Sequence, residues 1–432
     1  MRKILAVALA ISLLIGAILL PYARARPATP EQIEDIKNYE IRVDYIRASG
    51  DYEYGVSVGE RYGFLFKLVL PILVPVVEEL MGIPTPSPEH TRYLEDYYPG
   101  QFERLDGIES VTKVKPEQLI VLGLGLESSF GRGMGCTTSA SAPPATVGDE
   151  VLLSWNIDLF YLLKTVLRDI TSDPEFDVLE IFDMPLLFVR DIEGHNKVFC
   201  IGFPGVLELP LLNDRGLAFV SNAVPLDEEG PGLSHLELLN KAMDECTTVQ
   251  EAVRILEESP RFTTSGSDLA NLNYLFGDAN GGIASVEATH RYFAVRYGSE
   301  TGGVLAQANH HQWLDWRKTQ PSWAEKKAYS MRGSWMRATR MWDLLIENKG
   351  EIDLNKVMAF TADTANGPEP GVGGINSISR HGERDSPRKA GTCMAFVIQP
   401  KERMIWFCGA HPDEAPYVKI DVGKLFEEEE GQ

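Results

Sequence analysis

The sequence predicts an α+β fold in which helices cover antiparallel sheet. Strand candidates joined by short turns follow residue 135, and two long helical patterns at 234–258 and 323–347 interrupt them. The strand candidates are CTTSASAPPATVGDEVLLSWNIDL, NKVFCIGFPG, GLAFVSNAV, LNYLFGDANGGIASVEA, RYFAVRYG and a hairpin at 391–408. Strands joined by short turns pair antiparallel, so repeated parallel βαβ units fit this chain poorly.

Length and composition are those of a folded protein with a large core. The chain has 432 residues, enough for one large domain or two ordinary ones. Hydrophobic residues make up 44% and charged residues 24%. The formal net charge of −21 repels nucleic acid and anionic membranes, so we expect no nucleic-acid partner. Nothing in the sequence predicts an oligomeric state.

Residues 1–25 have the layout of a secretory signal peptide. Two basic residues precede an apolar run at residues 4–20, and a small-x-small pattern ends at Ala25. The run is long for a signal peptide and slightly short for a spanning helix. An uncleaved membrane anchor through residues 4–20 is therefore the alternative, and in both cases we expect the body of the protein outside the cytoplasm.

Three further segments lie in the N-terminal part. Residues 30–48 are expected to be helical, and residues 115–130 should form another helix. Residues 59–82 are strongly apolar, but Pro71 and Pro75 should interrupt a helix there. The main interpretation of this segment is a kinked core helix, and contact with a lipid-like substrate or a membrane is the alternative.

The five cysteines are odd in number, which leaves at least one thiol free in an exported protein. The pattern at 391–408 predicts a hairpin that turns at residues 399–402 and places Cys393 opposite Cys408. A cross-strand disulfide and two reduced core cysteines both fit that register. The expected free thiol is Cys136, because of its neighbours.

Cys136 lies in the segment GRGMGCTTSA, where three glycines within five positions allow backbone conformations closed to other residues. Cleavage of the Gly135–Cys136 bond would give Cys136 a free α-amine. An α-amine has a pKa of about 8 and a thiol one of about 8.5, so one residue would supply both a nucleophile and a base. An ordinary buried cysteine in a glycine-rich loop is the alternative.

Five stretches of the chain, taken in order, resemble the penicillin acyltransferase-like family of Ntn (N-terminal nucleophile) hydrolases, which includes isopenicillin N acyltransferase. They span roughly residues 55–422. The stretches are GVSVGERYG; GCTT with WNID; GFPGVLELPLLNDRGLAFVSN; FGDANGGIASVEAT with QANHH; and NSISRHGE with the 391–408 hairpin and CGAHPDEAPYVKIDV.

The resemblance implies a four-layer αββα sandwich and a set of catalytic residues. Cys136 would be the nucleophile that self-cleavage exposes, and Asp158 would hold the new α-amine. Asn309 would donate its side-chain amide to the developing oxyanion. Arg380 would balance charge near the nucleophile.

The resemblance also implies secondary positions at Thr138, Asn156 and Ser379, which would line or adjoin the pocket. At Trp155 this chain departs from many relatives, which have arginine directly before the N-x-D motif. The departure argues against a strongly anionic substrate group and indicates an apolar contact instead.

We therefore expect one Ntn-hydrolase domain over residues 26–432, cut into pieces 26–135 and 136–432 that remain packed together. Its reaction would be hydrolysis of a linear C–N amide in a small molecule or short peptide through an acyl-enzyme, without cofactor or metal. The alternatives are acyl transfer at the same site, a Cys-His hydrolase that uses His310 or His381 without chain cleavage, and a non-catalytic binding domain.

Overall fold

The computed structural model describes residues 43–81, 88–131, 135–160, 187–263, 270–321, 328–381 and 390–427. The signal-peptide or anchor segment at 1–25 lies outside these residues, so its prediction stays a prediction. Among the described residues, no helix is long and apolar enough to cross a membrane.

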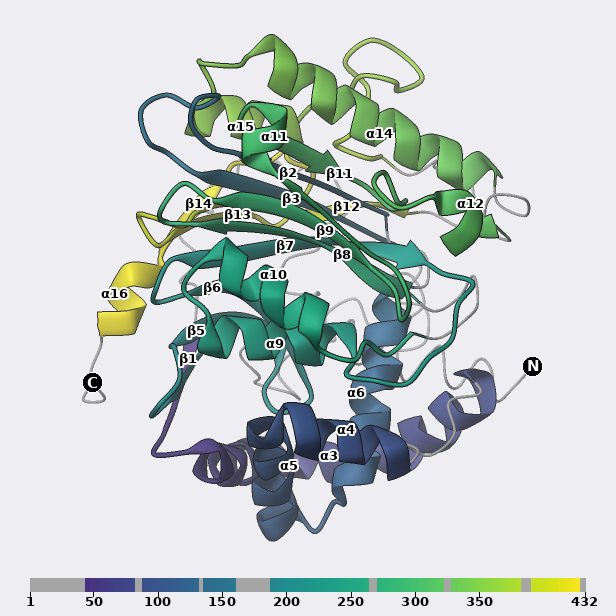
Figure 1. Ribbon diagram of the computed structural model, residues 1–432, viewed down its shortest axis with the longest axis vertical. Helices are drawn as coiled ribbons and strands as arrows, with labels where there is room; N and C mark the ends of the chain where they lie inside the picture. Colours follow the sequence, from purple (N-terminus) through teal and green to yellow (C-terminus); the bar gives the residue numbers. More distant parts are fainter. Residues whose placement is uncertain are drawn as a thin grey trace, which may run out of the picture.

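Two sheets form the centre of the molecule (Figure 1). The first has eight strands, in the order β1 (Val43–Ala48), β4 (Leu187–Ile192), β5 (Val198–Phe203), β6 (Leu207–Asn213), β7 (Leu217–Pro225), β8 (Ala270–Asp278), β9 (Ile283–Ala288) and β10 (Phe293–Tyr297). The second has six strands, in the order β11 (Val304–Gln307), β2 (Gly135–Ser141), β3 (Leu152–Phe160), β12 (Ala390–Gln399), β13 (Met404–Cys408) and β14 (Val418–Asp421). The pair β1–β4 is parallel, and the other described strand pairs are antiparallel.

The sheets pack face to face, with β2 and β3 against β7 and β8. Side chains of both sheets form one core cluster between them, including Leu153, Val220 and Phe396, each at most 1% exposed. Because side chains alternate along a strand, the opposite face of each sheet needs its own cover.

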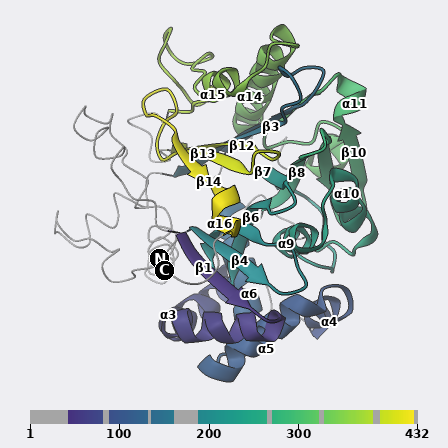
Figure 2. The same cartoon turned by 90° about the vertical axis from the view of Figure 1, so that its left-hand side faces the viewer.

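Helices supply that cover on both outer faces (Figures 1 and 2). The eight-stranded sheet is covered by three helices: α6 (Pro116–Gly131), α9 (His235–Glu245) and α10 (Val249–Glu258). Three further helices pack around α6 and β1, namely α3 (Asp51–Met81), α4 (Pro88–Tyr97) and α5 (Pro99–Thr112). The six-stranded sheet is covered by α14 (Ala328–Glu347) and α15 (Leu354–Thr361). Short helices α11 (Gly298–Thr301), α12 (Trp316–Thr319) and α16 (Val422–Glu427) complete the described elements. The predicted αββα order of layers is confirmed.

Local sequence explains where the covering helices begin. Ser234 and Thr248 each accept a hydrogen bond from the third helical N–H, and the carboxylates of Glu237 and Glu251 accept one from the backbone N–H of the capping residue. Such capping boxes satisfy amide groups that a helix start leaves unpaired. They fix the starts of α9 and α10 and separate two helices that the sequence pattern presented as one run.

Two expectations for the N-terminal part are wrong. Residues 43–48 form strand β1, not a helix, because they pair along β4. Pro71 and Pro75 do not interrupt the apolar segment, which lies within the continuous helix α3. Each proline removes one backbone donor, and the many remaining hydrogen bonds of a 31-residue helix keep it continuous.

The C-terminal hairpin forms, but the predicted register is wrong by two residues. Cys408 lies opposite Ala395, not Cys393, and Gln399 lies opposite Met404. The turn closes one residue later than expected, and Arg403 in it has a positive φ of 52°. All five cysteines are free, so the disulfide alternative is excluded in favour of reduced core cysteines.

A buried cluster of charges joins the N-terminal helices to the eight-stranded sheet. Arg104 on α5 donates to Asp51 at 2.6 Å and to Asp244 on α9 at 2.7 Å. Arg190 on β4 bonds the other oxygen of Asp244. Burial alone would raise the pKa of Asp244, but the two guanidinium groups outweigh it and hold that pKa well below its usual range.

We expect Arg104→Met to destabilise the protein by about 3–5 kcal/mol, because it leaves the Asp244 carboxylate buried with less compensating charge. Denaturant unfolding of the full chain measures the loss. The matched control is Arg92→Met, since Arg92 forms an exposed pair with Asp96 at 3.9 Å. We expect that control to cost less than about 1 kcal/mol. Equal losses in the two variants would contradict this role for Arg104.

Candidate active site

Cys136 is the second residue of β2 and is fully buried. It lies opposite Ile157 on β3 and belongs to the core cluster between the sheets. Because side chains alternate along a strand, Thr138 points to the same face of β2 as Cys136, and its hydroxyl donates to Asn222 Oδ1 on β7 at 2.6 Å. The thiol therefore faces the eight-stranded sheet, while the neighbours of Cys136 on β2 face α14.

Gly135 sits in a slot that has no room for a side chain. A Cβ built on it would lie 2.5 Å from both Asp158 Oδ2 and Arg380 Nη1. It would also lie 3.3 Å from Arg337 Nη2. A carboxylate and two guanidinium groups thus surround the residue directly before Cys136.

Asp158 lies opposite Gly135 in the strand register and is fully buried. Its Oδ1 accepts a hydrogen bond from Thr392 at 2.8 Å. Its Oδ2 accepts no hydrogen bond among the described residues, and Arg380 Nη1 is 3.7 Å away. Burial raises the pKa of Asp158 despite the opposing effect of Arg337 and Arg380. The site therefore holds a buried carboxylate oxygen with unused accepting capacity.

Arg337 on α14 is a member of the site that sequence reasoning missed. Its Nη2 donates to Asn309 Oδ1 at 2.6 Å, and its Nε donates to Thr137 Oγ1 at 3.1 Å. Burial lowers its pKa to about 10, against the opposing effect of Asp158. A signal was present in the sequence: Arg337 interrupts the otherwise uncharged buried stripe of α14, formed with Ser334, Ala338, Met341 and Leu345.

Asn309 follows β11 and contacts the backbone of Cys136. Its Oδ1 accepts from the backbone N–H of Cys136 at 2.9 Å, in addition to the Arg337 bond. Its Nδ2 donates to the carbonyl of Ala223 at 2.9 Å. The side chain that the resemblance assigned to an oxyanion thus holds the nitrogen of Cys136, with one amide hydrogen already used.

Arg380 and Ser379 lie in the segment that ends at His381. The backbone N–H of Arg380 donates to Thr392 Oγ1 at 2.8 Å, and the same hydroxyl donates to Asp158. Thr392 is a second residue that sequence reasoning missed, and no local pattern marks it. Ser379 is fully buried and donates to Asp413, away from Asp158.

The remaining predicted positions brace the site. Asn156 donates to the carbonyls of Thr361 and Ile378 at 2.9 and 3.0 Å, so it fixes the end of α15 and the approach to Arg380. Trp155 is 2% exposed, and its ring packs against Phe219 and Phe396. It is a core side chain beside the thiol.

The Cys136 thiol is held neutral. Its pKa is raised to about 12, first by burial and then by the nearby Asp158 carboxylate. Trp155, Arg337 and the backbone of Ala223 act in the opposite direction but do not overcome burial. A thiol in this state is a poor nucleophile until a base or a positive charge reaches it.

His310 and His381, the two alternative bases, and the neighbouring His311 are all held by other groups. His310 Nδ1 bonds Ser334, and His311 Nδ1 bonds Thr319. Burial lowers the pKa of each to about 3, so both are neutral. His381 pairs with the carboxylate of Asp413. These contacts do not favour the Cys-His alternative.

Glu287 on β9 anchors the loop that carries Asn309. It accepts backbone N–H groups from Gln312, Trp313 and Leu314 at 2.6–2.8 Å. Burial nevertheless raises its pKa to about 7, because it outweighs these three hydrogen bonds. The loop position therefore depends on a carboxyl group that titrates near neutrality.

The fold and site define a class of protein before any comparison is made. A four-layer αββα sandwich with a cysteine near the start of an inner strand is the arrangement that the resemblance to Ntn hydrolases implied. A family model described as acyl-coenzyme A:6-aminopenicillanic acid acyl-transferase matches residues 211–414, a little under half of the chain, and this part of the chain is similar to that family. The family comprises amidohydrolases and acyltransferases that act on small-molecule amides.

The matched segment contains Asn309, Ser379 and Arg380 but begins after Cys136 and Asp158. The strand that carries Cys136 therefore lies outside the matched segment. No curated protein matches the chain.

Solved structures of amide hydrolases are similar to the chain. A mutant of the conjugated bile acid hydrolase from Clostridium perfringens is 14% identical with a TM-score of 0.41, and the match covers 67% of this chain and 93% of that one. Penicillin V acylase from Agrobacterium tumefaciens is 18% identical with a TM-score of 0.32, over 69% of this chain and 81% of that one. With such low TM-scores, these similarities decide nothing about the function of this chain.

We expect Glu287→Gln to flatten the pH dependence of stability between about pH 4.5 and 7. A carboxyl whose pKa rises from 4.5 to about 7 on folding stabilises the protein below pH 4.5, and that contribution is lost as the pH rises through 7. Glutamine keeps an acceptor for the backbone N–H groups but does not titrate. Denaturant unfolding of both proteins across this range measures the difference, and parallel pH profiles would contradict the titration of Glu287.

Proposed function

We propose that the chain cuts itself between Gly135 and Cys136 and then acts as an N-terminal-cysteine amidase. Its substrate is a linear C–N amide of an acylated small molecule or short peptide. The observation that carries this proposal is the slot around Gly135, where the free oxygen of Asp158 and two guanidinium groups meet the bond to be cut.

Self-cleavage begins when the thiol adds to the carbonyl carbon of Gly135. Asp158, whose pKa is raised by burial, accepts the thiol proton and returns it to the nitrogen of Cys136. The C–N bond breaks, and a thioester joins Gly135 to the sulfur. Water then hydrolyses the thioester, which releases a carboxyl group on Gly135 and leaves Cys136 with a free amine and thiol.

The new amine has its partners in place. The nitrogen of Cys136 already donates to Asn309 Oδ1, which Arg337 holds in turn. The departure of Gly135 gives this nitrogen access to Asp158 Oδ2. In its neutral form this amine is a base that can take the thiol proton.

In turnover, the thiolate adds to the substrate carbonyl and forms an acyl-enzyme, and water completes hydrolysis. The amine returns its proton to the leaving nitrogen. Removing the amine from the peptide bond is therefore what converts a neutral, inert thiol into a nucleophile.

The two pieces of the cut chain, 26–135 and 136–432, form one domain in this proposal. The Arg104–Asp244 ion pair at 2.7 Å spans the cut, and so does the hydrogen bond from Tyr54 to Glu208 at 2.7 Å. Both are buried. These contacts support continued association after cleavage.

We keep export as part of the proposal, on the pattern of residues 1–25 alone. Export favours hydrolysis, because an exported enzyme lacks ready access to acyl-coenzyme A. Acyl transfer is the second candidate, since the matched family is described by that reaction. Adding a free amine acceptor to the reaction separates the two: a transferase forms the new amide, and a hydrolase releases the acid.

We expect N-terminal sequencing of the purified protein to find a chain that begins at Cys136. Cys136→Ala should leave one uncut polypeptide and abolish turnover, because both steps use the same sulfur. Asp158→Asn should slow self-cleavage at least tenfold, since the amide cannot accept the thiol proton. An active enzyme that remains a single chain through Cys136 would show that the proposal is wrong.

Gly135→Ala tests the slot itself. We expect slower self-cleavage with a loss of about 1–3 kcal/mol of stability, because the added methyl group displaces Asp158 and Arg380. The control is Gly423→Ala, where a Cβ meets nothing closer than 3.5 Å. Denaturing gels over time measure cleavage in both variants. Normal cleavage in Gly135→Ala would show that the close fit around Gly135 is not needed for self-cleavage.

A further inference from the structure

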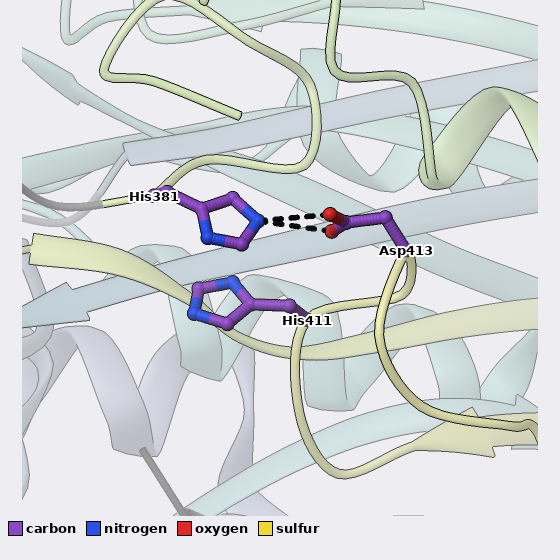
Figure 3. Close-up of side chains that lie close together, drawn as sticks. All are labelled: His381, His411 and Asp413. Atoms are coloured by element: carbon purple, nitrogen blue, oxygen red, sulfur yellow. Dashed lines mark hydrogen bonds and ion pairs between the residues drawn. The ribbon is translucent and has the colours of Figure 1, made fainter. Parts of the chain in front are cut away.

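His381, His411 and Asp413 come together beside the candidate active site (Figure 3). His381 ends the described segment that carries Ser379 and Arg380, while the other two residues lie in the loop between β13 and β14. One ligand atom from each of the three lies within 4.8 Å of the others. The chain has eight histidines, all in described segments, and no other such group of three occurs there.

The arrangement contains more than a histidine–carboxylate ion pair. His381 Nε2 faces both oxygens of Asp413, at 3.1 and 3.0 Å. The ring of His411 lies over that of His381, with centroids 3.9 Å apart and planes 12° apart. The ion pair joins His381 and Asp413, and His411 brings a third group of a metal-binding type to the same place.

We propose that these three side chains bind a divalent transition-metal ion of the zinc class. The ligands would be one ring nitrogen of each histidine and one oxygen of Asp413. Imidazole and carboxylate are a donor set that suits zinc and its neighbours in the first transition row. Three protein ligands leave a fourth position of a tetrahedral site open to water or another small ligand.

The required movement is small. In a tetrahedral site, zinc–nitrogen and zinc–oxygen bonds of about 2.0–2.2 Å separate the ligand atoms by about 3.4 Å. His381 Nε2 and Asp413 Oδ2, which are 3.0 Å apart, must therefore move slightly apart to admit the ion, while the ligand atom of His411 already lies within 4.8 Å of the others. Asp413 is an exposed residue in a loop, and His381 is at the end of its described segment. Rotation of these side chains closes the site without displacing a strand.

Two neighbouring groups hold the ligands in orientation. The hydroxyl of Ser379 donates to Asp413 Oδ1, which leaves Oδ2 for the metal. Glu414 Oε1 lies 4.0 Å from Nδ1 of His381, the ring nitrogen that faces away from Asp413. A carboxylate behind a metal-binding histidine fixes its ring and increases its basicity. Both supports are built into the fold around the cluster.

The site connects directly to the candidate active site. Ser379 and His381 flank Arg380, which is bonded through Thr392 to Asp158. A bound ion would tie this segment to the loop that follows β13. Binding to the folded state alone stabilises it in proportion to the logarithm of metal concentration.

The test uses untagged, full-length Cys136→Ser protein, so that a cysteine thiol made reactive by self-cleavage does not compete for zinc. Titration with Zn²⁺ in a calorimeter should give one equivalent, and Co²⁺ should develop the visible d–d absorption of a tetrahedral site. His411→Ala and Asp413→Asn should each weaken binding at least tenfold. His411→Gln is a second variant in case alanine disturbs the loop, and circular dichroism confirms that each variant is folded.

The matched control is His195→Ala. His195 pairs with Asp51 at 2.9 Å and is 22% exposed, against 21% for His381, but it belongs to no group of three metal-binding side chains in the described part of the chain. We expect this variant to bind the metal as the parent does. Failure of the parent to bind Zn²⁺ or Co²⁺, or equal binding after loss of His411, would overturn the proposal. Neither outcome depends on self-cleavage, so the test is separate from the proposed function.

Discussion

The buried carboxylate of Asp158 is the constraint on which the site depends. An ionised carboxylate away from water is stable only when opposite charges and hydrogen bonds compensate it. Here Thr392 supplies one hydrogen bond, and the guanidinium groups of Arg337 and Arg380 supply charge. The space among these groups is filled by Gly135, because any side chain would collide with them. The positions of these charged groups therefore require a glycine directly before Cys136.

This arrangement explains why the layers matter to the chemistry. Strands β2 and β3 place Gly135 opposite Asp158, α14 brings Arg337 across the outer face, and the loop after β11 brings Asn309 to the backbone of Cys136. Each element contributes one group, and the sheets keep all of them out of water. In such surroundings a single new charge, such as an ammonium group, strongly changes the pKa of the groups around it.

The N-terminal helices belong to the same unit. Their buried arginine and tyrosine meet carboxylates that follow Cys136 in the chain, so the proposed cut lies between two partners of a shared core. At the other end of the site, the segment around Arg380 reaches His381 and the loop with Asp413. Arg380 thus lies between the carboxylate of Asp158 on one side and the proposed metal-binding cluster on the other.

The sequence by itself determined the class of fold and pointed to candidate catalytic residues. Turn spacing, helical periodicity and the Gly-Cys-Thr and N-x-D motifs are local features that can be read without the tertiary structure. It also singled out Cys136, Asp158 and Asn309, which the structure brings together. It failed where pairing is distant: residues 43–48 became a strand only because β4 lies beside them, and the hairpin register depended on a turn that lies one residue later than expected. Arg337 reaches Thr137 across 200 positions of the chain, Thr392 reaches Asp158 across 234, and His411 reaches His381 across 30. Such contacts are set by how sheets and helices pack, so only the tertiary structure decided them.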